Sequence, residues 1–189
     1  FIMAVVAAFT YGYIHNTLVI SDSPETTFKN LKTNGLLFQM EILGWLLILI
    51  LDVLVAWAFY VFFKNESPKL SIIMAGLRVV YTVIFGVAIF NLIPVLNIIN
   101  GNLEFGKEMA SQQIMASLES FESIWSFALI IFGFHLLFLG VLALKAKYIH
   151  NFWGILLVFA AVCYTVIHSA KFLLPEFENQ IATAEMILS

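Results

Sequence analysis

The chain has 189 residues, of which 62% are hydrophobic and 11% are charged, and its formal net charge is −3. A soluble domain usually carries about 45–50% apolar and about 25% charged residues, so this composition excludes an ordinary soluble domain and indicates a chain surrounded by lipid. The sequence has no basic run, which argues against a nucleic-acid partner. Its single cysteine, Cys163, excludes an internal disulfide.

Five segments are long and apolar enough to span a bilayer, which requires about 20 mostly apolar residues. Because an open strand edge in lipid would leave backbone groups unpaired, the spans are expected to be helices. The sequence therefore predicts an all-α, polytopic transmembrane helix bundle that forms a single transmembrane domain over residues 1–189. The predicted spans cover about 1–20, 35–63, 70–99, 110–144 and 152–174.

The first predicted span carries no charge and is longer than the apolar part of a secretory signal, which favours a retained helix. Because the chain begins with Phe1 rather than methionine, we expect its natural N-terminus to lie further upstream. After this span, Asp22 or Ser23 is expected to cap a short surface helix, with Pro24 at its first position. This helix is predicted to end near Leu31.

Lysines in the connections predict the orientation of the chain. The connections 64–69 and 145–151 are basic, so the positive-inside rule places both in the cytoplasm. The neutral first connection, the acidic segment 100–122 and the acidic C-terminal tail are expected on the outer side. The fourth span is expected to begin early, near Gly106, and to project from the bilayer as an amphipathic extension. Residues 180–189 turn mildly apolar again, which predicts a sixth span beyond them.

Ionisable side chains within the spans are the first functional candidates, because they are costly in lipid. Asp52 and Arg78 lie at similar distances from the basic hairpin that joins their two helices, so we predict that they form an ion pair. His135 lies ten residues before the next basic connection and therefore falls at the same depth. The predicted inner polar layer consists of Asp52, Arg78, His135 and Tyr81, the last one turn from Arg78.

A second, outer polar layer is predicted nearer the opposite surface. Glu41 shares one helix face with Asp52, three turns away. On the last span, His168 and Lys171 share a face with Tyr164. The predicted outer layer consists of Glu41, His168, Lys171, His15, Asn91 and Glu122.

Each of these candidates also has a structural explanation. The Asp52–Arg78 pair can fix the register of two helices. Lys171 can extend to the headgroups, and a neutral His135 can bond to a neighbouring hydroxyl or carbonyl group. The sequence lacks HExxH and paired-cysteine motifs, and a haem between His135 and His168 is disfavoured by a difference in depth of about 10 Å. We therefore expect neither a metal nor a cofactor.

Several stretches of the sequence carry a family resemblance. Residues 125–140 contain the pattern Phe-Gly-x-His that ends at His135, and residues 51–60 precede the run Arg78-Val79-Val80-Tyr81. Together they resemble the bacterial membrane-protein family known as domain of unknown function 4386, over nearly the whole chain. The resemblance implies a six-helix protein of the bacterial inner membrane in which the residues of the inner layer share one environment. It implies no activity. The family's usual last helix is not within these residues.

Three functions stay open at this point. The first is a non-enzymatic helper or structural membrane subunit, expected because no catalytic motif is present. The second is a small proton-coupled transporter that uses the intramembrane Asp, Arg and His layer. The third is an intramembrane enzyme that modifies a lipid, with His168, Glu41 and Glu122 as acid, base or ligands. The expected partners are membrane lipid and other membrane proteins or a second copy of this chain.

Overall fold

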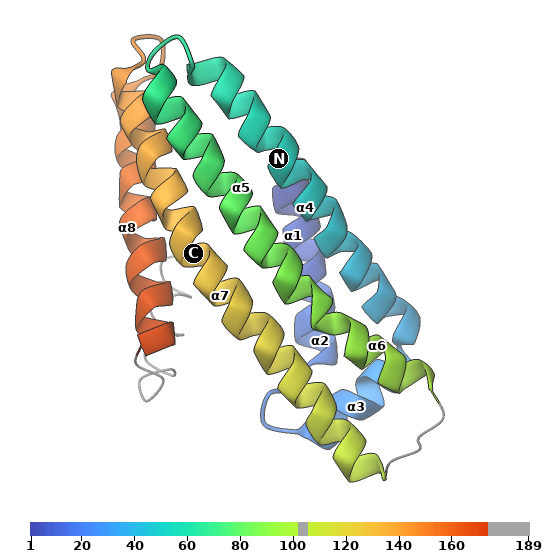
Figure 1. Ribbon diagram of the computed structural model, residues 1–189. Helices are drawn as coiled ribbons and strands as arrows, with labels where there is room; N and C mark the ends of the chain where they lie inside the picture. The colour runs from blue at the N-terminus through green and yellow to red at the C-terminus, as the bar shows by residue number, and fades with distance from the viewer. Residues whose placement is uncertain (102–105, 174–189) are drawn as a thin grey trace. The chain divides into compact units, whose positions relative to one another are not determined.

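The computed structural model describes residues 1–101 and 106–173, and these residues form helices without strands (Figure 1). The predicted all-α class is therefore confirmed. Residues 102–105 of the acidic segment 100–122, the acidic C-terminal tail and residues 180–189, for which the sequence made predictions, lie outside the described residues. The helices are α1 (Ile2–Ala7), the π-helix η1 (Ala8–His15), α2 (Asn16–Leu18), α3 (Pro24–Thr33), α4 (Gly35–Phe63), α5 (Pro68–Phe90), α6 (Leu92–Asn100), α7 (Lys107–Lys145) and α8 (Asn151–Leu173).

Four helical segments of the described chain are long and apolar enough to cross a membrane. They are Gly35–Phe63 with 29 residues, Pro68–Asn100 with 33, Lys107–Lys145 with 39 and Asn151–Leu173 with 23. This is the architecture of a polytopic transmembrane helix bundle. The number of spans is one fewer than predicted, because the segment 1–20 is helical only as far as Leu18 and is extended at Val19.

The predicted span 70–99 is formed by two helices rather than one. The break lies at Asn91, between α5 and α6. Pro94 explains its position, because proline has no N–H and its ring clashes with the carbonyl group four residues earlier, at Phe90. The side chain of Asn91 donates to the carbonyl oxygens of Val87 and Ala88 and so satisfies backbone acceptors near the break.

The chain divides into two compact units. Unit 1 contains Phe1–Leu51 and Gly86–Ser123, and unit 2 contains Asp52–Phe85 and the chain from Ile124 onward. The division falls within α4, α5 and α7.

In unit 1 the N-terminal helical segment packs closely on α4. A Cβ atom added to Gly44 would collide with the side chain of Thr10, and the side chain of His15 reaches Glu41. Thr10 precedes His15 in the N-terminal segment, whereas Gly44, which faces Thr10, follows Glu41 in α4. The two segments therefore run antiparallel. The buried face of α4 here carries Phe38, Glu41, Trp45 and Ile48, at the three- and four-residue spacing of one helix face.

In unit 2 the helices α7 and α8 come close together at glycine residues. A Cβ atom on Gly140 would lie 2.8 Å from the side chain of Val158 and 3.0 Å from the backbone oxygen of Gly154. Small residues of this kind allow membrane helices to pack at short distance. The apolar core of this unit includes Phe63, Met74, Leu136, Leu139, Leu142, Ala146 and Ala161.

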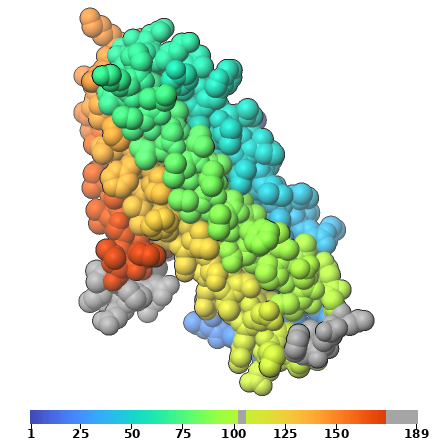
Figure 2. Space-filling model, in the orientation of Figure 1, coloured from blue at the N-terminus to red at the C-terminus, as the bar shows by residue number. Residues whose placement is uncertain are grey.

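The outward face of α4 is apolar along its length. Figure 2 shows part of this surface in cyan, and its exposed side chains suit contact with lipid. They include Leu43, Leu47, Ile50, Leu54 and Trp57.

Candidate functional site

The structure brings Asp52, Arg78 and His135 together in unit 2. Oδ1 of Asp52 accepts hydrogen bonds from Nε of Arg78 at 3.0 Å and from Nη2 at 2.5 Å. Nη1 of Arg78 lies 3.1 Å from Nε2 of His135. All three residues are buried, on α4, α5 and α7 respectively. The guanidinium group thus joins three helices at one point.

The partners of His135 determine its protonation. Nδ1 lies 2.9 Å from the backbone oxygen of Met74, which can only accept a hydrogen bond, so Nδ1 must carry the proton. Nε2 faces the guanidinium group of Arg78, which can only donate, so Nε2 must be unprotonated. His135 is therefore neutral in this geometry. The cluster carries one negative and one positive charge, which compensate each other.

Aromatic rings enclose this cluster. The ring of Phe132 lies 5.4 Å from Cζ of Arg78 and 5.5 Å from the His135 ring, so it covers the cation in the manner of a cation–π contact. The predicted member Tyr81 lies beside the group, where its ring contacts Phe132 at 5.0 Å and stacks on Phe85 at 5.9 Å. The sequence prediction did not include Phe132. Its position three residues before His135, on the same face of α7, is the signal that could have found it.

One hydrogen-bond acceptor of the Asp52–Arg78–His135 cluster is not used within the cluster. Oδ2 of Asp52 is buried and has no hydrogen-bond partner among the described residues. A buried carboxylate oxygen without a partner is costly, so this atom is the place where a proton or a water molecule would be bound most readily.

A second cluster forms in unit 1 around His15. Its Nδ1 lies 2.6 Å from Oε1 of Glu41, and its Nε2 lies 3.3 Å from Oε1 of Glu122. Trp45 also donates through Nε1 to Oε1 of Glu41, at 3.4 Å. Because ionised carboxylates only accept, the bridge requires protons on both ring nitrogens, or a proton on one carboxyl group. With a charged imidazolium and two carboxylates, the cluster has a net charge of −1.

The two carboxyl groups of this second cluster differ in their access to solvent. The side chain of Glu41 is fully buried, and its Oε2 has no hydrogen-bond partner among the described residues. The side chain of Glu122 is 49% exposed. The ring of Tyr11 stacks on His15 at 5.2 Å, and Phe121 lies 6.1 Å away. The histidine thus connects an exposed carboxyl group with a buried one, and aromatic rings lie beside it.

The other predicted members of the outer layer do not join this cluster within unit 1. Asn91 bonds to the backbone of its own helix. His168 and Lys171 belong to unit 2, where Nδ1 of His168 lies 2.9 Å from the hydroxyl oxygen of Ser126. Among residues 1–101 and 106–173, no group of three or more His, Cys, Asp or Glu side chains is arranged to hold a metal ion.

Comparisons with known proteins agree with the family resemblance. The model of the family described as "Domain of unknown function (DUF4386)" matches residues 1–189. An uncharacterized protein from Archaeoglobus fulgidus is 31% identical over 126 residues, which cover 67% of this chain and 64% of the relative. The chain thus spans slightly less than two thirds of that relative's length. No solved structure matches.

Removing one charge of the Asp52–Arg78 pair is expected to destabilise the protein more than removing both. Asp52→Leu leaves the Arg78 charge buried and unpaired, which should cost about 3–5 kcal/mol of unfolding free energy. The double variant Asp52→Leu/Arg78→Met should recover most of this loss. Denaturant unfolding in detergent micelles, arranged as a double-mutant cycle, measures the effect.

The matched control for this cycle is Glu66→Leu, which removes an exposed carboxylate from the connection between the same two helices. We expect it to change stability by less than about 0.5 kcal/mol. Additive effects of the two single substitutions would show that Asp52 and Arg78 do not stabilise each other.

Proposed function

The chain belongs to the family described as Domain of unknown function (DUF4386), and we propose that this member is a non-enzymatic helper or structural membrane subunit. The observation that supports this proposal is the use of the Arg78 guanidinium group. Its Nε, Nη1 and Nη2 all face Asp52 or His135. The guanidinium group of Arg78 already bonds to Asp52 and His135, and the Phe132 ring covers it. Such a group is better suited to holding helices together than to binding a substrate.

Charge balance supports the same proposal. An unpaired charge within a membrane protein is costly, whereas a compensated pair can specify how helices fit together. The neutral tautomer of His135 fits this role because it links α7 to the backbone of α5 at Met74 and adds no charge. As partners we propose membrane lipid together with other membrane proteins or a second copy of this chain, since α4 exposes a long apolar face.

A small proton-coupled transporter is the second candidate, and the His15 cluster is the observation that favours it. A histidine between a buried and a half-exposed carboxyl group can pass a proton from one to the other. For the lipid-modifying enzyme, Glu41 and Glu122 belong to unit 1 and His168 to unit 2. Neither unit by itself therefore holds the three groups that such an enzyme would need.

Proton flux into liposomes separates the two candidates. For a helper or structural subunit, liposomes that contain the purified protein and a pH-sensitive dye should respond to a pH gradient at the rate of protein-free liposomes. For a transporter, the protein should accelerate the response, and Glu122→Gln should slow it at least tenfold, which is about 1.4 kcal/mol of barrier.

Glu119→Gln is the matched control for this experiment, because Glu119 is an exposed carboxylate one turn before Glu122 on α7. Flux that depends on Glu122 and not on Glu119 would contradict the helper proposal and favour the transporter.

We also propose an orientation, in which the connections 64–69 and 145–151 face the cytoplasm of a bacterium and the membrane is its inner membrane. The basis is the four lysines of these connections, Lys64, Lys69, Lys145 and Lys147. In this orientation the first turns of α7 face outward.

Cysteine labelling checks the orientation. In a Cys163→Ala background, a membrane-impermeant maleimide should label Gln112→Cys in intact cells, because Gln112 is exposed on the outward part of α7. It should label Lys69→Cys only after the cells are opened. The reverse pattern would contradict the proposed orientation.

A further inference from the structure

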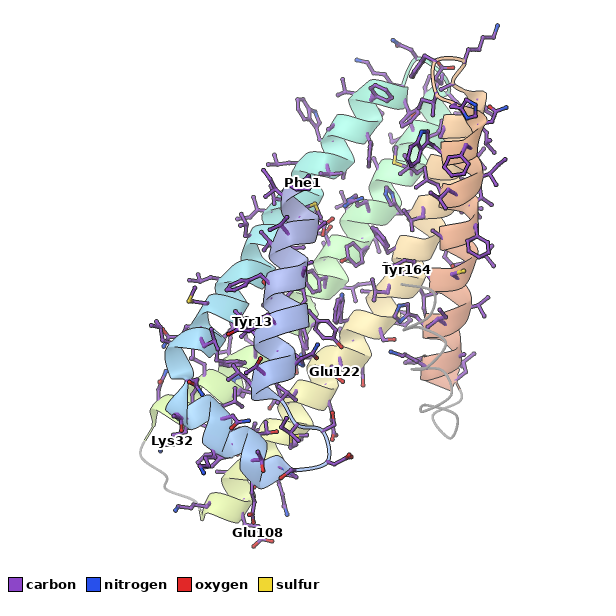
Figure 3. The ribbon with its side chains drawn as sticks, turned by 180° about the vertical axis from the view of Figure 1, so that it is seen from behind. Phe1, Tyr13, Lys32, Glu108, Glu122 and Tyr164 are labelled. Atoms are coloured by element: carbon purple, nitrogen blue, oxygen red, sulfur yellow. The ribbon has the colours of Figure 1, made fainter. Side chains whose placement is uncertain are left out.

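A cavity of about 490 Å³ lies at one end of unit 1, and none of the residues of the two polar clusters line it. It is formed by α3 and by the first turns of α7, which are more than seventy residues apart in sequence. Figure 3 labels Lys32 on α3 and Glu108 on α7 at this end. The polar side chains that line the cavity include Lys29, Lys32, Lys107, Glu25, Glu108 and Ser111.

The charges around the cavity favour a negatively charged ligand. Three ammonium groups and two carboxylates give a net charge of +1. Within the described ranges, no ion pair joins any of the three lysines to another residue. Their charges are therefore available to a ligand.

The position of the lysines follows from the packing of α3. This helix is amphipathic and buries Thr27, Phe28 and Leu31, while Lys29 and Lys32 stay exposed. Nζ of Lys32 lies 5.9 Å from the centre of the Phe28 ring, which is buried and also lines the cavity. α3 is therefore held by an apolar face and presents its ammonium groups beside an aromatic ring.

The cavity lies where a lipid headgroup is expected. α3 ends at Thr33, and α4, which is long and apolar enough to cross the membrane, begins at Gly35. Lys107 is the first residue of α7, so the positive end of that helix dipole adds positive potential at the same place. In Figures 1 and 3, α3 lies near the first turns of α7.

We propose that this cavity binds the headgroup of an anionic phospholipid whose phosphodiester carries hydroxyl groups, such as phosphatidylglycerol. The lysines suit the phosphodiester charge. The carboxylates of Glu25 and Glu108 suit hydroxyl groups, from which they can accept hydrogen bonds, but they oppose the higher charge of free inorganic phosphate. The headgroup would hold α3 and the start of α7 at the membrane surface. This inference does not rest on the proposed function.

Lipid titration of the purified protein in detergent, followed by native mass spectrometry, tests the proposal. The probes are dioleoylphosphatidylglycerol and dioleoylphosphatidylcholine. Each lysine near an anionic lipid contributes about a fivefold gain in affinity, so phosphatidylglycerol should bind at least tenfold more tightly than phosphatidylcholine. The variant Lys29→Gln/Lys32→Gln/Lys107→Gln should remove this preference and leave phosphatidylcholine binding unchanged.

The matched control is Lys64→Gln/Lys69→Gln/Lys145→Gln, which removes the same charge from connections outside the cavity. We expect it to keep the preference. An unchanged preference in the cavity variant, or an equal loss in the control, would overturn the proposal. Displacement of phosphatidylglycerol by millimolar inorganic phosphate would assign the site to free phosphate and overturn the lipid assignment.

Folding of the variants is checked by circular dichroism. If the triple variant does not fold, Lys32→Glu alone replaces it, since Lys32 is exposed and its reversed charge should still lower phosphatidylglycerol affinity at least tenfold. An affinity within twofold of the unmodified chain would again overturn the proposal.

Discussion

The charge of Arg78 is the constraint on which the rest of unit 2 depends. A guanidinium group within an apolar helix is tolerated only if another group compensates its charge and accepts its hydrogen bonds. Asp52 supplies the charge, and both Asp52 and Nε2 of His135 accept from it. Because these acceptors come from α4 and α7, the requirement of one side chain on α5 fixes the rotation and register of three helices. The glycine contacts between α7 and α8 then add the fourth helix.

The two polar clusters differ in the protons that their hydrogen bonds require. Around Arg78, every hydrogen bond that joins Asp52, Arg78 and His135 forms without an additional proton on any group, and His135 is neutral. Around His15, two carboxyl groups face the two nitrogens of one ring, so the arrangement depends on a proton that can reside on more than one atom. If the protein transfers protons, the His15 cluster of unit 1 is therefore the better candidate for that chemistry. The first cluster is better explained as a structural element.

The sequence was sufficient for features that depend on distance along the chain. Length and hydropathy identify α4, α7 and α8, and counting residues from a short hairpin places Asp52 opposite Arg78. Depth alone does not determine which way a side chain points around its helix. For this reason the predicted outer layer grouped His15, Glu41 and Glu122 with Asn91, although the amide of Asn91 donates to the backbone of α5.

Features that depend on the meeting of distant segments could not be read from the sequence. The cavity between α3 and α7 requires a short surface helix to lie against the start of a spanning helix. The close contact of Thr10 with Gly44 depends on how the N-terminal segment, which includes a π-helix, packs on α4. The break at Asn91, by contrast, was signalled by Pro94, because proline disrupts the helical turn that precedes it.

The charges of the Arg78 cluster compensate each other only if His135 is neutral. Solid-state nuclear magnetic resonance of the protein in lipid bilayers, with nitrogen-15 in its histidines and His135 assigned by His135→Gln, measures this protonation state. If His135 is neutral in this cluster, its Nδ1 is protonated and its Nε2 is unprotonated at neutral pH. A signal from His135 with both nitrogens protonated, or with the proton on Nε2, would contradict this assignment.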